Sequence, residues 1–258
     1  MNIDEIKKKI RGEIGKEILF CRNADSTNTL ALGLAETTPE GLVVIADSQI
    51  SGKGRLGRTW WSPPGKNLYL SILLKPRLEP SEVTLITVMS AVACSRAIRR
   101  TTGLNATIKW PNDLLVSDKK IGGILTELKL LGKGIACAVV GIGINVNSGR
   151  EQLPEDIRET ATSVKIEKGS TVRREAFVAA TLNEVDRWYA LLKDGKRHVL
   201  IEEWKGLSST LGKKVSVVIG NRMLSGTAES VDEEGRLILR LASGGAEKIH
   251  SGDLTVLR

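Results

Sequence analysis

One glycine-rich and strongly basic segment, residues 51–67, limits which nucleotide-binding folds this chain can adopt. Its sequence is SGKGRLGRTWWSPPGKN, and its first half matches GxGxxG, the spacing of the dinucleotide-binding fingerprint. That fingerprint requires a helix directly after the glycines, because the N-terminus of the helix binds the pyrophosphate. Here Pro63, Pro64 and Gly65 prevent such a helix. A Rossmann domain is therefore disfavoured, and the sequence also contains no GxxxxGK[ST] phosphate-binding loop.

The charge of the same segment is unbalanced. Its positive side chains are Lys53, Arg55, Arg58 and Lys66. No Asp or Glu occurs from residue 51 to residue 78, so these cations repel one another until an anion arrives. One interpretation is a solvated loop whose charge aids solubility. The other is a mobile loop that orders over a phosphate-bearing ligand, and the glycine N–H groups and the anchoring Trp60 and Trp61 favour it.

The whole chain is also basic, with 258 residues and a formal net charge of +8. This charge favours an anionic partner such as a nucleotide, a nucleic acid, an acidic protein or a membrane surface. The three cysteines, Cys21, Cys94 and Cys137, are isolated, which predicts reduced thiols and a cytoplasmic protein. The charged N-terminus is no signal peptide, and no apolar run approaches the ~20 residues that span a bilayer.

Hydrophobic periodicity predicts a mixture of helices and strands without strict βαβ alternation, which indicates an α+β fold. We expect helices over residues 1 to about 17, from Ser26 onward, from Ser81 to Gly103 and over about 171–193. We expect strands over 41–49, 67–76, 107–110, 113–118, 122–130 and 134–147, and a loop over 148–170.

After residue 208 the sequence changes to short β-runs broken by Gly and Asp, which predicts a small all-β barrel. We therefore expect a short N-terminal helical extension over 1–18, a main domain over 19–208 and a C-terminal β domain over 211–258.

Three further motifs accompany the basic segment. They are KWPNDLL (109–115), KIGGILTEL (120–128) and GIGINVN (141–147). Alone, each has an ordinary interpretation: an Asn-Asp turn, a solvated lysine before a buried strand, and small residues at the end of a strand. Their spacing relative to the basic segment is what makes the combination specific.

The combined pattern resembles the biotin protein ligases. The resemblance rests on STN (26–28), Gln49, SGKGRLGRTWWSP, NLYLS, KWPND, KIGGIL-TE and GIGIN, and it covers about residues 19–258. It implies a catalytic domain related to class II aminoacyl-tRNA synthetases, with a mixed β-sheet and flanking helices, followed by an SH3-like β-barrel. It also implies the reaction: biotin and ATP give biotinyl-5′-AMP, and the biotinyl group then passes to a lysine of a biotin carboxyl carrier protein.

The resemblance further implies a role for particular residues. The residues implied around biotin are Ser26, Thr27, Asn28, Gln49, Lys53, Gly54, Arg55 and Lys120. Those implied around the nucleotide are Gly52, Arg58, Trp60, Asn112, Asn145 and Arg258. Lys120, Arg55 and Lys109 are the implied catalytic cations, and Asp113 is the implied contact to Mg²⁺.

The chain departs from the family pattern in two ways. The family loop usually reads GRGRxGR, and Lys53 replaces its first Arg, which keeps the charge but loses the bidentate fork. Some bacterial members carry an N-terminal DNA-binding domain, whereas here residues 1–18 alone precede the resemblance, so we expect no DNA-binding role and no membrane association. Family members are often dimers, so the resemblance makes a homodimer one candidate, but the sequence shows no decisive interface signal and leaves the oligomeric state open.

Two other functions remain open at this point. A lipoate-type acyl-adenylate ligase of the same superfamily would use the same adenylation chemistry with a different acid. A nucleic-acid-binding protein would use the basic loop as a backbone clamp, although such proteins usually stack bases on exposed aromatic side chains, which make up only 3% of this sequence.

Overall fold

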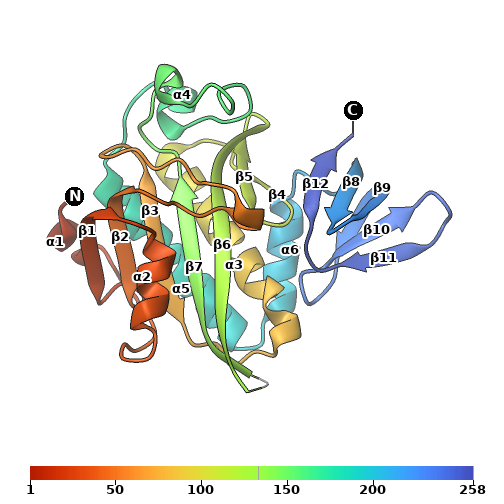
Figure 1. Cartoon of the computed structure of the whole chain (residues 1–258), viewed down its shortest axis with the longest axis horizontal. Helices are drawn as coiled ribbons and strands as arrows, with labels where there is room; N and C mark the ends of the chain where they lie inside the picture. Colours follow the sequence, from red (N-terminus) through yellow and green to blue (C-terminus); the bar gives the residue numbers. More distant parts are fainter. Residues whose placement is uncertain (133, 258) are drawn as a thin grey trace.

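The computed structural model describes residues 1–132 and 134–257, which form a seven-stranded sheet with flanking helices and a separate five-stranded sheet (Figure 1). The strands of the larger sheet are β1 (Ile18–Ala24), β2 (Val43–Gln49), β3 (Leu68–Leu74), β4 (Thr107–Lys109), β5 (Asp113–Val116), β6 (Lys119–Leu131) and β7 (Gly134–Ile144). The helices are α1 (Ile3–Lys7), α2 (Thr27–Leu34), α3 (Thr84–Thr102), α4 (Val164–Lys168), α5 (Arg174–Lys193) and α6 (Arg197–Leu207).

The larger sheet is mixed, in the order β1-β2-β3-β7-β6-β5-β4. In the described part of this sheet β1 and β2 pair in parallel, and each following pair, from β2–β3 through to β5–β4, is antiparallel. This arrangement confirms the α+β class that the sequence predicted.

Helices cover both faces of this sheet, and the strand residues alternate between them. Leu70 and Ile72 of β3 belong to the main core with α3 and α5, whereas Leu73 packs on the opposite side with Val139 of β7. That second, smaller cluster lies under α2, which crosses in front of β2, β3 and β7 in Figure 1. The apolar core on one face of the sheet is therefore larger than the core on the other face.

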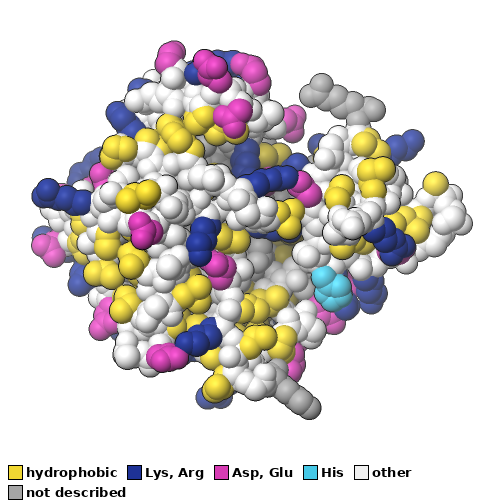
Figure 2. Space-filling model, viewed as in Figure 1, with side chains coloured by type: hydrophobic (Ala, Val, Ile, Leu, Met, Phe, Trp, Pro, Cys, Tyr) yellow, Lys and Arg dark blue, Asp and Glu magenta, His cyan; other side chains and the backbone are white. Residues whose placement is uncertain are grey.

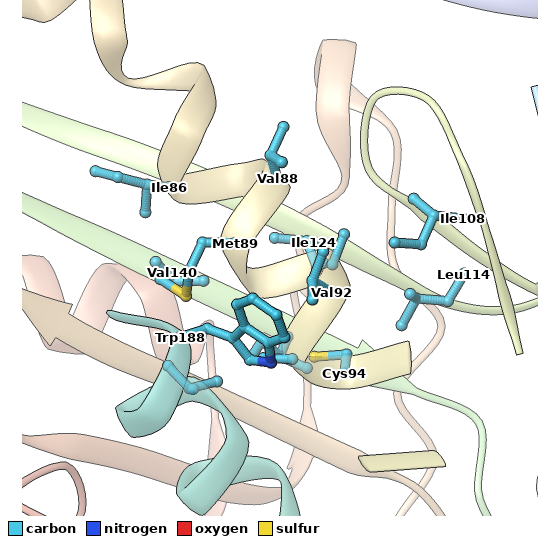
Figure 3. Packing of buried hydrophobic residues seen from close by; sticks show 14 of the residues in the cluster. Ile86, Val88, Met89, Val92, Cys94, Ile108, Leu114, Ile124, Val140 and Trp188 are labelled. Carbon is cyan, nitrogen blue, oxygen red and sulfur yellow. The ribbon is translucent and has the colours of Figure 1, made fainter. Parts of the chain in front are cut away.

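Helix α3 lies at the centre of the main core. Its side chains Ile86, Met89 and Val92 meet strand residues from β6 and β7 and Trp188 of α5 (Figure 3). The segment Pro80–Thr102 is long and apolar enough to cross a membrane, with a mean hydropathy of 1.3 over its most apolar stretch. However, 67% of that stretch is buried inside the protein. Burial against the sheet explains its apolar composition.

The smaller sheet is an antiparallel barrel in the order β11-β10-β9-β8-β12. Its strands are β8 (Lys214–Ile219), β9 (Arg222–Val231), β10 (Leu237–Leu241), β11 (Ala246–Ile249) and β12 (Asp253–Val256). Trp110 fastens it to the main domain: its backbone N–H donates to Thr210 Oγ1 at 3.0 Å, and its indole Nε1 donates to the Gly235 carbonyl at 3.3 Å. This SH3-like unit agrees with the expected fold.

Several local predictions need correction. The first helix ends at Lys7 and does not extend to residue 17. Backbone N–H groups within residues 11–14 instead donate hydrogen bonds to side chains of α5. The long helix begins at Thr84, after a 3-10 turn over Pro80–Glu82, and it ends before Gly103, whose φ of 77° confirms the predicted stop. Helix α4 interrupts the predicted loop, and α6 was missed.

Met89 offers a test of this core. It is 0% exposed, so Met89→Ala leaves a cavity and should lower the free energy of unfolding by about 2–5 kcal/mol. Val199→Ala, at a position that is 37% exposed on α6, should change it by less than about 1 kcal/mol. Urea unfolding followed by circular dichroism measures both, and equal effects of the two substitutions would contradict this packing.

Candidate active site

A cavity of 490 Å³ opens where the larger sheet, the basic loop and the barrel meet. Its walls come from the start of α2, the end of β2, residues 53–61, strands β3, β6 and β7, residues 154–161 and Asp253 of β12. In Figure 2, Lys and Arg side chains gather near the centre of the visible face, between the main domain and the barrel. The cavity is large enough for a nucleotide-sized ligand.

Buried polar side chains form one end of this cavity. Ser26, Thr27 and Asn28 stand at the N-terminus of α2 and are each less than 5% exposed. The Ser26 side chain makes no capping bond to its helix. The backbone N–H of Thr27 donates to Gln49 Oε1 at 2.9 Å, and the Ser71 hydroxyl donates to Asn28 Oδ1 at 2.6 Å. Such fully buried groups need partners, and a polar ligand supplies further ones.

The basic loop folds over the cavity and is held by both domains. Arg55 Nη1 donates to Asn112 Oδ1 at 2.9 Å, and Nη2 donates to the carbonyl of Gly252 in the barrel at 3.2 Å. Burial lowers the pKa of Arg55, and the carboxylates of Asp113 and Asp253 partly oppose this. Because arginine keeps its proton in proteins, the loop places a permanent, partly desolvated cation at the cavity. Arg58 also forms an ion pair with Asp253.

A lysine and a tryptophan form the opposite wall. Lys120 Nζ lies 2.6 Å from Asp113 Oδ1 and 5.6 Å from the centre of the Trp60 ring. Trp60 lies directly on the backbone of β7, because a Cβ built on Gly143 would be 2.5 Å from its ring. Gly52 is equally constrained, since a Cβ there would meet the Trp60 carbonyl at 2.4 Å. Tight backbone packing thus fixes the position of Trp60.

The segment 154–161 closes another side. Pro154, Asp156 and Ile157 line the cavity, and the backbone N–H of Lys120 donates to the Thr160 carbonyl at 2.8 Å. Asn145 lines the cavity at 4% exposure, and its Nδ2 donates to the Thr162 carbonyl at 3.0 Å.

The structure brings most of the predicted site residues together. Those that line the cavity are Ser26, Thr27, Asn28, Gln49, Lys53, Gly54, Arg55, Arg58, Trp60, Asn112, Asp113, Lys120 and Asn145. Gly52 lies just behind the wall, against Trp60 and Ser62. Lys109 is not among the lining residues, and Arg258 lies outside the described residues.

Sequence reasoning missed other contributors. Ser71 had a usable signal, because it is a polar residue in the middle of the fully buried strand β3. Pro154, Asp156 and Ile157 carried none, since the segment around them is irregular and polar. Asp253 is 106 residues from the nearest motif, which ends at Asn147, and only the docking of the barrel brings it to the cavity.

Comparisons with known proteins consistently match this chain to one family of ligases. The family model described as "Biotin/lipoate A/B protein ligase family" matches residues 19–145, and the model "Biotin protein ligase C terminal domain" matches residues 210–254. The chain is 31% identical to the bifunctional ligase/repressor BirA of Bacillus subtilis over 255 residues, which cover 97% of this chain and 77% of that protein.

Two further relatives agree. The chain is 32% identical to the biotin–[acetyl-CoA-carboxylase] ligase of Paracoccus denitrificans over 85% of this chain and 92% of that protein. Its fold is similar to that of the biotin protein ligase from Aquifex aeolicus solved in complex with biotin and ATP, with a TM-score of 0.79 and 28% identity over 94% of this chain and 99% of that one.

The contact between Trp60 and Gly143 can be tested. Gly143→Ala places a methyl group where the ring lies, so Trp60 must move and one wall of the cavity is lost. At a cost of about 1–3 kcal/mol, biotin should bind roughly 5- to 150-fold more weakly in calorimetry. Gly134→Ala on the same strand, where the nearest atom is 3.9 Å away, should bind biotin as the wild type does. Unchanged affinity in Gly143→Ala would refute the role of this contact.

Proposed function

Because the chain belongs to the family of biotin protein ligases, we propose that its cavity activates biotin with ATP and transfers the biotinyl group to a lysine of a carrier protein. The observation that carries this proposal is one cavity in which a buried polar pocket meets the partly desolvated guanidinium of Arg55 and the ammonium group of Lys120. The similarity to a ligase solved with biotin and ATP supports it.

The reaction brings two anions together, which explains the need for these cations. In the first step the biotin carboxylate attacks the α-phosphorus of ATP, the bond to the β-phosphate oxygen breaks, and pyrophosphate leaves. We assign Lys120 and Arg55 to this step, because each places a positive charge at the cavity wall where negative charge accumulates. Lys109 does not line the cavity, so we leave it outside this role.

In the second step the amine of the carrier lysine attacks the acyl carbon of biotinyl-5′-AMP, AMP leaves, and the nitrogen loses a proton. The anhydride must be kept from water until the amine arrives. We assign that protection to residues 53–58, whose Arg55 is tied to Asn112 on one side and to the barrel carbonyl of Gly252 on the other.

The two ends of the cavity suit the two substrates. We place the ureido ring of biotin among buried Ser26, Thr27 and Asn28 and half-buried Gln49, whose polar atoms would satisfy its N–H and carbonyl groups. The residues assigned to the nucleotide are Asn112, Asn145, Arg58 and Trp60, with Gly52 setting the loop conformation.

Mg²⁺ is part of the proposal through Asp113. Among the described residues, no group of three or more Asp, Glu, His or Cys side chains is placed to hold a metal ion. The Asp113 carboxylate lines the cavity, and Mg²⁺ usually binds through one or two carboxylates and the phosphates of its substrate. The ion would neutralise phosphate charge there.

Several properties of the whole protein follow as proposals. The partner is the carrier domain of acetyl-CoA carboxylase or another carboxylase, and the net charge of +8 suits an acidic partner. We propose a cytoplasmic enzyme, consistent with free Cys21, Cys94 and Cys137.

We also propose a homodimer. This proposal is supported by Leu130 and Leu131, which are exposed on the β6–β7 hairpin. We also propose residues 19–208 as the catalytic domain and 211–258 as the C-terminal domain.

The central experiment combines the protein with ATP, Mg²⁺ and an apo carrier domain, together with biotin or lipoate. Mass spectrometry of the carrier should detect one added biotinyl group, and a carrier with its acceptor lysine replaced by Arg should stay unmodified. If lipoate is transferred and biotin is not, the lipoate-type alternative replaces this proposal.

The role of Lys120 has its own test. Lys120→Ala removes a positive charge beside the reacting phosphate and should slow biotin-dependent pyrophosphate release on the order of 100-fold or more. Lys119→Ala, one residue earlier on β6 and outside the cavity lining, is the matched control and should keep wild-type rates. Normal pyrophosphate release by Lys120→Ala would remove the lysine from the chemical step.

A further inference from the structure

Glu127 is the acid of the KIGGILTEL motif, and it has no role in the reaction as described so far. It lies on β6 behind the polar end of the cavity and is not among the lining residues. Its Oε2 accepts a hydrogen bond from Asn28 Nδ2 at 2.7 Å, and its Oε1 lies 3.7 Å from Lys53 Nζ. One carboxylate therefore contacts both the buried polar pocket and the basic loop.

The first contact fixes the orientation of the Asn28 amide. An ionised carboxylate only accepts hydrogen bonds, and the Leu125 carbonyl, 3.3 Å from the same Nδ2, also only accepts. The NH₂ group of Asn28 must therefore point toward Glu127 and Leu125. Its Oδ1 then points toward Ser71, at 2.6 Å.

The orientation of the Asn28 amide determines which groups donate in the neighbouring hydrogen bonds. Because Asn28 Oδ1 can only accept, the single hydroxyl proton of Ser71 must be donated to it. The Ser71 and Thr27 hydroxyl oxygens lie 2.7 Å apart, closer than the Thr27–Gln49 contact of 3.2 Å. Because the one Ser71 proton is committed to Asn28 Oδ1, we infer that Thr27 is the donor across this short contact. With its own proton committed, Thr27 Oγ1 offers lone pairs to a ligand. The pocket thus presents acceptors, as the two N–H groups of a cyclic urea require.

We propose that Glu127 is a positioning residue that sets the hydrogen-bond polarity of the biotin pocket and couples it to the basic loop through Lys53. The proposal rests on the proposed function of the cavity. It also explains the lysine that replaces the family's usual arginine, since a single ammonium group suffices to meet the one Glu127 oxygen that Asn28 leaves free.

The test compares Glu127→Ala and Glu127→Gln with Glu36→Gln. Glu36 pairs with Lys129, two residues along the same strand, and it lies outside the cavity lining. Glu127→Ala should raise the dissociation constant for biotin on the order of tenfold or more in calorimetry, because the amide of Asn28 is then free to turn over. Glu127→Gln keeps an acceptor and should recover part of the affinity, whereas Glu36→Gln should match the wild type.

Kinetics separate positioning from general damage. In Glu127→Ala the KM for biotin should rise while the KM for ATP and the urea midpoint of unfolding stay near wild-type values. An equal loss for both substrates, or an unchanged affinity for biotin, would overturn the proposal. A wild-type protein that does not bind biotin at all would instead refute the proposed function.

The coupling to the loop is tested with Lys53→Met. If the Lys53–Glu127 pair acts as a unit, the double variant Lys53→Met/Glu127→Ala should bind biotin no more weakly than the weaker single variant. Losses that multiply in the double variant would show independent residues and would remove Lys53 from the proposal.

Discussion

The cavity depends on a change of side-chain size along one face of the central sheet. Because strand residues alternate, Cys137, Val139, Gly141 and Gly143 of β7 point to the same face. The first two pack under α2, and the two glycines leave the space that Asn28 and Trp60 occupy, since a Cβ on either glycine would lie within 2.5 Å of these side chains. One strand therefore supplies both a core face and the floor of a site.

The barrel completes a site that the main domain leaves open. Arg55 is bonded to both domains, and Arg58 pairs with Asp253 of β12, so a loop of like charges meets acceptors from the far end of the chain. Each exposed ion pair alone stabilises little. Together with the partly desolvated guanidinium of Arg55, however, they hold the loop over the cavity, so the small domain contributes directly to the structure of the site.

The sequence predicted the mixed fold, because glycines, prolines and buried strands act locally, and most of the site residues that the family resemblance implied line the cavity. Gly103 ended its helix as expected, and the segment 51–61 reached the cavity. Residues whose position depends on long-range packing could not be predicted. Lys109, inside a motif, falls outside the lining, while Asp253, outside every motif, reaches it through the docking of the barrel.

The Lys53 position shows that a sequence motif alone does not determine what its side chains contact. The sequence alone predicts that Lys in place of Arg loses the bidentate hydrogen bonds to an anionic ligand. In the structure the side chain is directed to Glu127, so the loss concerns a contact within the protein. A lysine held by a carboxylate carries less net charge toward the ligand than a free one. In the proposed reaction, the positive charge that acts on the phosphates then falls to Arg55 and Lys120, and Lys120 is paired with Asp113 in the structure.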